Sequence, residues 1–182
     1  MNRELRAVFP SAAKILCICA VTFFIAVPSH AARHTTPKPA QIKADRIVVL
    51  KSERTLMLMH EGKPFKTYKV ALGGQPIGPK TQQGDHKTPE GTYTIDGRNL
   101  HSQFYKGLHV SYPSAQDVAQ ARKRGVSPGG AIMIHGLPNG MAWVGSAHLA
   151  RDWTDGCIAV TDEEIDEIWK LVPNGTLVEI KP

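Results

Sequence analysis

Short apolar runs separated by polar turns dominate the chain after residue 45. Val, Ile, Leu, Met and Tyr prevail in the first three runs, and the loops between them are short and polar. Runs of this length and composition are typical of strands, and short connections favour antiparallel neighbours. The pattern therefore predicts an antiparallel meander with strands at 46–50, 55–60 and 65–72.

Further short strands are predicted toward the carboxyl end. They lie at 92–95, 108–112, 132–136, 152–160 and 177–180. The stretch 73–90 instead carries repeated Gly and Pro residues, and a turn-rich segment of this length in a compact domain is usually functional or mobile. Its His86, Lys80 and Lys87 either bind an acidic ligand or are simply solvated.

Two short helices are predicted from their amino-terminal caps. Ser114 and Asp117 form a capping box ahead of 115–124. Thr161 and Glu164 form a second one, and the apolar residues that follow recur at helical spacing, which indicates one buried face. The predicted fold class is therefore mainly β, a β-rich α+β domain with two or so short helices.

The first 32 residues have the three parts of a secretory signal peptide. Basic residues precede an apolar run at 15–27, and small residues within 28–32 fit a cleavage site. The run is short for a membrane span, and an uncleaved anchor is the alternative. Residues 33–44 have a linker composition. We therefore assign 1–32 to a signal peptide, 33–44 to a linker and 45–182 to one folded domain.

Composition and charge narrow the range of functions and partners expected for the protein. A chain of 182 residues that is 42% hydrophobic can bury one real core but not two. The formal net charge of +6 suits an anionic polymer or a membrane surface. Since no Lys and Arg run with interleaved aromatic residues occurs, nucleic acid is not an expected partner. We expect an exported protein of the periplasm or cell envelope, with no stable membrane span after signal cleavage.

Two reactive side chains stand at the ends of predicted strands, each beside a glycine. Cys157 is the only cysteine outside the amino-terminal apolar run, so the exported domain offers it no intramolecular disulfide partner. A thiol at its ordinary pKa is mostly protonated at neutral pH, and an imidazole that accepts the proton removes this limit. His135 is the candidate base. The alternatives are an inert buried thiol and a hydrogen-bonded core histidine.

The backbone beside the thiol and the segment before it complete the candidate site. Gly156 lets a substrate carbonyl approach closely, and the N–H groups of Gly156 and Cys157 are candidate donors to a developing oxyanion. The segment 137–151 is expected to form a wall or lid. It contains Trp143, His148 and Arg151.

Four short motifs in a fixed order resemble the L,D-transpeptidase catalytic domain, also called the YkuD domain. They are Ala71-Leu72-Gly73, the segment from Gly84 to Tyr93, Ile134-His135-Gly136 and Gly156-Cys157-Ile158. The resemblance extends over nearly everything from residue 46 to residue 182. It implies a YkuD-type β-sandwich or barrel-like mixed sheet with few helices.

The resemblance also implies a reaction in cell wall organisation and the maintenance of cell shape. Cys157 would attack the carbonyl of diaminopimelate in a peptidoglycan tetrapeptide stem, expel D-alanine and form a thioester. An amine of a second stem, or of a wall-anchored lipoprotein, would resolve it. His135 matches the family's base, and the backbone at Gly156 and Cys157 matches its oxyanion site. The expected partners are thus peptidoglycan stem peptides and a lipoprotein, and neither a cofactor nor a metal is implied.

The sequence departs from the family's commonest pattern near the nucleophile. Asp155 stands where a histidine is usual, and Ala159 stands where Arg or Asn is frequent. The gap between His135 and Cys157 is also longer. A carboxylate at Asp155 tends to raise the pKa of the thiol unless it orients a histidine, for which His148 and His135 are candidates. A plain turn residue is the alternative.

Supporting residues are assigned from these positions. Auxiliary roles go to Asp155, Gly136 and His148. Arg151 is the candidate cation for the substrate's carboxylates, because Ala159 supplies none. Trp143 and Thr154 complete the expected substrate-binding set.

Three other functions remain open from the sequence. The segment 104–113 also resembles a family branch with hydrolases, in which water resolves the thioester as in an L,D-carboxypeptidase or an amidase that releases a lipoprotein. A zinc peptidase would use His135, His148 and Cys157 as ligands, although the usual metallopeptidase spacings are absent. A non-catalytic wall-binding module would leave the thiol inert.

Overall fold

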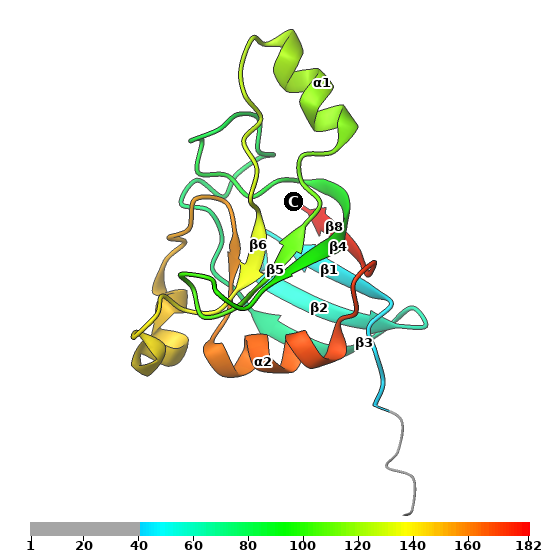
Figure 1. Ribbon diagram of the computed structural model, residues 1–182, viewed down its shortest axis with the longest axis vertical. Helices are drawn as coiled ribbons and strands as arrows, with labels where there is room; N and C mark the ends of the chain where they lie inside the picture. The colour runs from blue at the N-terminus through cyan, green and yellow to red at the C-terminus, as the bar shows by residue number, and fades with distance from the viewer. Residues whose placement is uncertain (1–40) are drawn as a thin grey trace, which may run out of the picture. The chain divides into compact units, whose positions relative to one another are not determined.

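The computed structural model describes residues 41–182 (Figure 1). The predicted signal peptide and residues 33–40 of the predicted linker lie outside this part of the chain. Within it, no helix has the length and apolar character needed to cross a bilayer. Ala44 is already buried and its N–H donates to the carbonyl of Leu171 at 2.9 Å, so packing begins at this residue.

Eight strands form one mixed sheet in the order β3-β2-β1-β8-β4-β5-β6-β7 (Figure 1). The pairs β1–β8 and β6–β7 are parallel, and the other neighbours are antiparallel. The strands are β1 (Arg46–Leu50), β2 (Thr55–His60), β3 (Lys63–Lys69), β4 (Gly91–Asn99), β5 (Gly107–Val110), β6 (Met133–His135), β7 (Ile158–Ala159) and β8 (Leu177–Lys181).

The predicted meander is confirmed, with one shift. β3 begins two residues earlier than expected and ends at Lys69. The reason is the turn at Glu61 and Gly62, which both have positive φ angles, 50° and 76°. A two-residue turn of this kind matches the twist of the flanking strands, so His60 already pairs with Lys63.

The two ends of the sheet meet. Ala71, which follows the edge strand β3, exchanges both backbone hydrogen bonds with Ala159 of the opposite edge strand β7, at 3.0 and 2.9 Å. The sheet therefore curls into a half-barrel with few helices, which confirms the expected mainly β, barrel-like fold. The strand predicted at 152–160 was too long, because the turn around Gly156 restricts pairing to Ile158–Ala159.

The three short helices differ in how they meet the sheet. α2 (Asp162–Leu171) has the predicted capping box and packs Ile165 and Ile168 into the apolar core. α1 (Ala115–Lys123) also has its predicted capping box but projects away from the sheet (Figure 1). The third, the 3₁₀ segment η1 (Ala142–Ala150), is kinked at Gly145 and was not predicted as a helix.

Candidate active site

Cys157 lies directly before β7, at the end of a turn that Thr154 fastens. The Thr154 hydroxyl donates to the Cys157 carbonyl at 2.7 Å and accepts the Gly156 N–H at 3.1 Å. Gly156 has φ +123°, and a Cβ there would lie 2.5 Å from the carbonyl oxygen of Lys87. Only glycine fits where the turn and the 73–90 segment approach so closely.

These contacts decide which of the two expected oxyanion donors is free to donate a hydrogen bond. The Gly156 N–H is already bound by Thr154, so it is not free in this conformation. The Cys157 N–H donates to no acceptor in the described part of the chain. Of the two N–H groups singled out from the sequence, Cys157 supplies the available one. Thr154, expected to bind substrate, is buried and instead braces the turn.

The Cys157 thiol is half-buried and held by backbone groups. Sγ accepts the Met133 N–H at 3.4 Å and donates to the Ala131 carbonyl at 3.5 Å. Burial raises the pKa of the thiol, and this outweighs the lowering by the hydrogen bond from the Met133 N–H; the Asp155 carboxylate raises the pKa further and Lys80 lowers it, each by less. The resting side chain is therefore a protonated thiol at neutral pH.

His135 lies on β6 and pairs with Ala159 on the parallel strand β7. Cys157 directly precedes β7, and its Sγ accepts the N–H of Met133, two residues before His135 on β6, so the thiol and the imidazole belong to the same pair of strands. The His135 Nδ1 lies 2.7 Å from the Gly136 carbonyl and donates to it, which leaves Nε2 as the acceptor nitrogen. Burial lowers the pKa of His135, and the Gly136 bond only partly opposes this. The resting imidazole is neutral.

No hydrogen bond joins Cys157 Sγ to His135 within residues 41–182, because the thiol is turned toward Ala131. Catalytic hydrogen bonds are often loose without substrate and tighten in the complex. The hydrogen bond to the Ala131 carbonyl must therefore break before the thiol can give its proton to His135.

Two aromatic residues that sequence reasoning missed enclose the imidazole. The ring of Phe104 lies 4.5 Å from that of His135, and the indole of Trp153 lies 5.9 Å away at a steep angle. Both keep water from the base. Trp153 stands within four residues of Cys157 in the sequence, and this proximity was the available signal.

Asp155 binds a histidine, but not one of the two that were expected. Its Oδ1 lies 2.7 Å from Nδ1 of His86, so the predicted pairing with His148 or His135 is wrong. His86 is brought here because its carbonyl accepts the Gln75 N–H at 2.9 Å and lies against Gly73, where a Cβ would clash with it. The pair is exposed at the rim of the site.

The rest of the 73–90 segment is fixed by a buried carboxylate. Burial raises the pKa of Asp85, but hydrogen bonds from Lys80, Thr81, Gln82 and Lys87 outweigh this and lower it to about 2. The Lys80 ammonium, 2.8 Å from Asp85, is buried and committed to this contact. It is therefore a structural cation and not a solvated or ligand-binding one.

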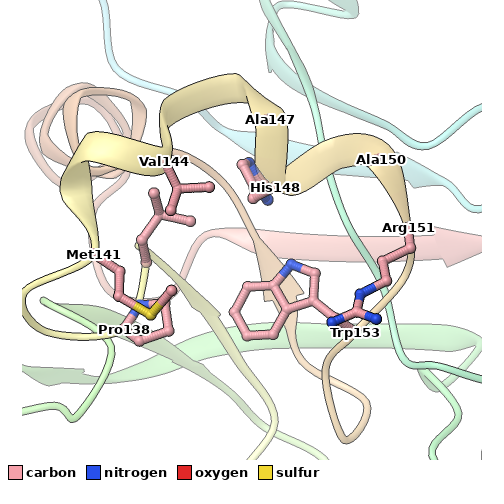
Figure 2. Close-up of a pocket in the computed structure, with 9 residues that line it drawn as sticks. Pro138, Met141, Val144, Ala147, His148, Ala150, Arg151 and Trp153 are labelled. Atoms are coloured by element: carbon pink, nitrogen blue, oxygen red, sulfur yellow. The ribbon is translucent and has the colours of Figure 1, made fainter.

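A cavity of about 400 Å³ lies beneath η1, within the segment expected to form a wall or lid (Figure 2). Trp153, His148 and Arg151 line it together with apolar side chains of 137–150. Trp143, expected to bind substrate, does not line it and is 81% exposed on η1. Arg151 forms no ion pair or side-chain hydrogen bond among the described residues.

The zinc alternative lacks a ligand set. Among residues 41–182, no three side chains of His, Cys, Asp or Glu gather closely enough to hold a metal ion. Trp153 neighbours both histidines, with its ring centroid 6.4 Å from that of His148 and 5.9 Å from that of His135.

Comparisons with known proteins identify the family and the fold. Residues 44–180 match the family YkuD, the L,D-transpeptidase catalytic domain. The Escherichia coli K12 protein named "Putative L,D-transpeptidase YafK" is 33% identical over 142 residues, which cover 75% of this chain and 50% of that protein. The chain thus spans about half the length of the curated relatives it matches.

Two solved structures share the fold. The helical cell shape determining protein Pgp2 from Campylobacter jejuni superposes with a TM-score of 0.57 at 22% identity, covering 74% of this chain and 46% of that one. Bd1075 from Bdellovibrio bacteriovorus gives 0.51 at 22% identity, with 75% and 47% covered. At these identities the likeness establishes the fold alone.

Proposed function

The chain belongs to the L,D-transpeptidase catalytic domain family, and from this premise we propose that it is a peptidoglycan L,D-transpeptidase with Cys157 as nucleophile and His135 as base. The observation that supports the proposal is the contact of Cys157 Sγ with the N–H of Met133 on β6, the strand that ends in His135. The Gly136 carbonyl fixes the imidazole tautomer so that Nε2 can accept the thiol proton.

The first half-reaction acylates the enzyme. The Cys157 proton passes to His135 Nε2, and Sγ bonds to the carbonyl carbon of diaminopimelate in a tetrapeptide stem. The carbonyl oxygen takes the electron pair, and the free Cys157 N–H is its donor. Collapse breaks the amide bond, D-alanine leaves with the proton from the imidazolium, and a thioester remains.

The second half-reaction transfers the acyl group to an amine. The amine nitrogen of a second stem attacks the thioester carbon, and His135 takes its proton. Collapse breaks the C–S bond, and the imidazolium returns the proton to Cys157 Sγ. An amine of a lipoprotein is the other candidate acceptor of the acyl group, by the same steps. Water in place of the amine would hydrolyse the thioester.

The electrostatics suit a proton transfer coupled to attack. Burial raises the pKa of Cys157 and lowers that of His135, so the resting pair is neutral. The Cys157 thiol gives its proton to His135 only as Sγ bonds to a carbonyl carbon. A free thiolate therefore does not accumulate, which limits its side reactions. We also propose that the protein is exported and acts in the cell envelope, where peptidoglycan lies, with residues 1–32 as its signal peptide.

The test is muropeptide analysis after the purified full chain is incubated with disaccharide tetrapeptide. Dimers linked between two diaminopimelate residues are expected from the wild type, and none from C157A or H135N. His60→Asn is the matched control, since His60 lies on the β2–β3 hairpin.

Other outcomes would change the assignment. Loss of terminal D-alanine without dimers would mean that water resolves the thioester. Unchanged dimer formation by C157A would contradict the proposal altogether.

A further inference from the structure

A polar groove of about 660 Å³ lies between α1, β4 and the 73–90 segment. Gln116 and Gln120 line it from α1, Thr92 from β4 and Lys80 from the 73–90 segment. It shares no lining residue with the cavity beneath η1. The volume of the groove is within the range of sites that bind small ligands, so it can hold part of a polymer.

Both ends of α1 are fixed beside this groove, although the helix buries only Ala121 and projects away from the sheet (Figure 1). At the amino end, the Tyr93 hydroxyl of β4 donates to Oδ2 of Asp117 at 3.2 Å. At the carboxyl end, the guanidinium of Arg124 donates to the carbonyl of Thr81 at 2.9 Å. The helix therefore contributes little to the core, and these contacts hold it as a wall of the groove.

Among its described lining residues, the groove offers no free cation to an anionic ligand. The Lys80 ammonium is committed to Asp85, and Lys51 balances the carboxylate of Glu90, each at 2.8 Å. The amino end of a helix attracts anions, but Asp117 already lies in the first turn of α1. The remaining charge is negative, so carboxylates and phosphates are disfavoured here.

The groups that stay free in the groove are neutral. Gln116, Gln120 and Thr92 are exposed, and their side chains make no hydrogen bond in the described part of the chain. The two glutamines are four positions apart and share one face of α1, with Cβ atoms about 5–6 Å apart. Each amide both donates and accepts, as does the hydroxyl. The acetamido and hydroxyl groups of a neutral sugar polymer require this mixture of partners.

We propose that the groove binds the glycan strand of peptidoglycan, a polymer of N-acetylated hexosamines. The strand is neutral where the muramic acid carboxyl is amide-linked to a stem. The assignment rests on the proposed function and makes Gln116, Gln120 and Thr92 substrate-binding residues outside the reaction centre. Because the groove repels carboxylates, the stem peptide is not its ligand, and glycan and stem bind at different places on the protein.

The groove lies close to the reaction centre. Lys80 lines it, and the same ammonium lowers the pKa of the Cys157 thiol, so it lies near both. The segment that follows α1 leads to Ala131, whose carbonyl accepts the thiol hydrogen. A glycan strand held in the groove keeps the stems that it carries near Cys157, which raises their effective concentration there.

The experiment titrates the full chain with chitotetraose, the neutral tetramer of N-acetylglucosamine. The readout is the NMR signals of the Gln116 and Gln120 side-chain amides, which should shift and saturate together. Cellotetraose has the same sugar backbone without acetamido groups, and it should bind about fivefold more weakly, the effect of one neutral hydrogen bond. Unmoved amide signals would overturn the proposal, as would equal affinity for the two sugars.

Substitutions on α1 test the two amides directly. Q116A/Q120A should weaken chitotetraose binding on the order of tenfold. Alanine is a better helix former than glutamine, so the loss is not due to unfolding of α1. Lys123→Ala is the matched control, because Lys123 lies on α1 but does not line the groove, and it should bind as the wild type does. Wild-type affinity in Q116A/Q120A would overturn the proposal.

An acidic probe tests the charge of the ligand. Tetragalacturonate carries a carboxylate on every ring, and it should bind more weakly than chitotetraose because the groove is negative. Tighter binding of tetragalacturonate would overturn the assignment to a neutral glycan and indicate a polyanion site instead.

Kinetics distinguish this proposal from the proposed function. With glycan strands that carry tetrapeptide stems, Q116A/Q120A should raise KM more than it lowers kcat, and the rise should be absent with free tetrapeptide. An equal rise with both substrates would overturn the proposal. If the wild-type chain formed no dimers from either substrate, the proposed function would fail. Chitotetraose binding is measured without turnover and is judged separately.

Discussion

His86 Nδ1 lies 2.7 Å from Asp155 Oδ1, a side-chain contact across 69 positions of sequence. It joins the 73–90 segment to the turn that carries Cys157. Family members commonly have an imidazole at the position of Asp155, whereas here the imidazole comes from another part of the chain. The Asp155 carboxylate, which raises the pKa of the Cys157 thiol, is thus hydrogen-bonded to His86.

Replacing Asp155 by Asn should lower the pKa of the Cys157 thiol. The carboxylate raises this pKa by disfavouring the thiolate, and the amide removes the charge. The rate of iodoacetamide labelling against pH should then rise at lower pH than in the wild type. Asp45→Asn is the control, because Asp45 lies by the β2–β3 hairpin. An unmoved labelling profile in D155N would contradict this account.

Removing His86 should change the pKa of the Cys157 thiol only through its effect on Asp155. His86→Ala leaves the carboxylate without its hydrogen-bond donor, and the thiol pKa is expected to rise. In a double-mutant cycle the H86A substitution should have no further effect once Asp155 is Asn. Thiol labelling of the four proteins measures the coupling. Additive effects would show that His86 acts on the thiol by another route.

Gly73→Ala should disrupt the site. A Cβ at Gly73 would clash with the His86 carbonyl and reach 3.1 Å from the Gly156 Cα, so both loops must shift. We expect a loss of about 1–3 kcal/mol in unfolding free energy, with loss of dimer formation. Gly130→Ala is the matched control, since its nearest contact is an ordinary 3.9 Å. Urea denaturation and muropeptide analysis measure the two effects.

Phe104→Ala should shift the acid limb of kcat/KM. Burial lowers the pKa of His135, so the base stays neutral to a pH below its ordinary pKa. Without the ring at 4.5 Å, water reaches the imidazole, its pKa rises, and activity is lost at a higher pH as the pH falls. NMR titration of the His135 ring protons tests the shift, with Phe65→Ala as control. A fall of this pKa would refute the argument.

The two capping boxes should contribute unequally to stability. Thr161→Ala removes the cap of α2, whose Ile165 and Ile168 lie in the core, and should cost about 1 kcal/mol of unfolding free energy. Ser114→Ala should cost less in global unfolding, because α1 buries only Ala121 and can fray locally. Urea denaturation compares them, and equal losses would contradict the prediction.

Much of the fold could be predicted because its signals are local. A capping box is complete within four residues, so Ser114 with Asp117 and Thr161 with Glu164 were recognisable before any tertiary contact was known. The meander followed from the length and composition of the apolar runs and from the short polar loops between them. Family motifs singled out Cys157 and His135 in the same way. The first residue of β3 could not be predicted in this way, because it depended on the φ angles of two turn residues.

What the sequence by itself determined is the order of most strands, the two capped helices, the mainly β class and the two candidate reactive side chains. Tertiary structure alone decided that Ala71 pairs with Ala159, that His86 reaches Asp155 and that Phe104 covers His135. The physical reason is that side-chain type and spacing are properties of a short segment. These contacts instead depend on how far the sheet curls before its two edges meet, which is set by all eight strands together.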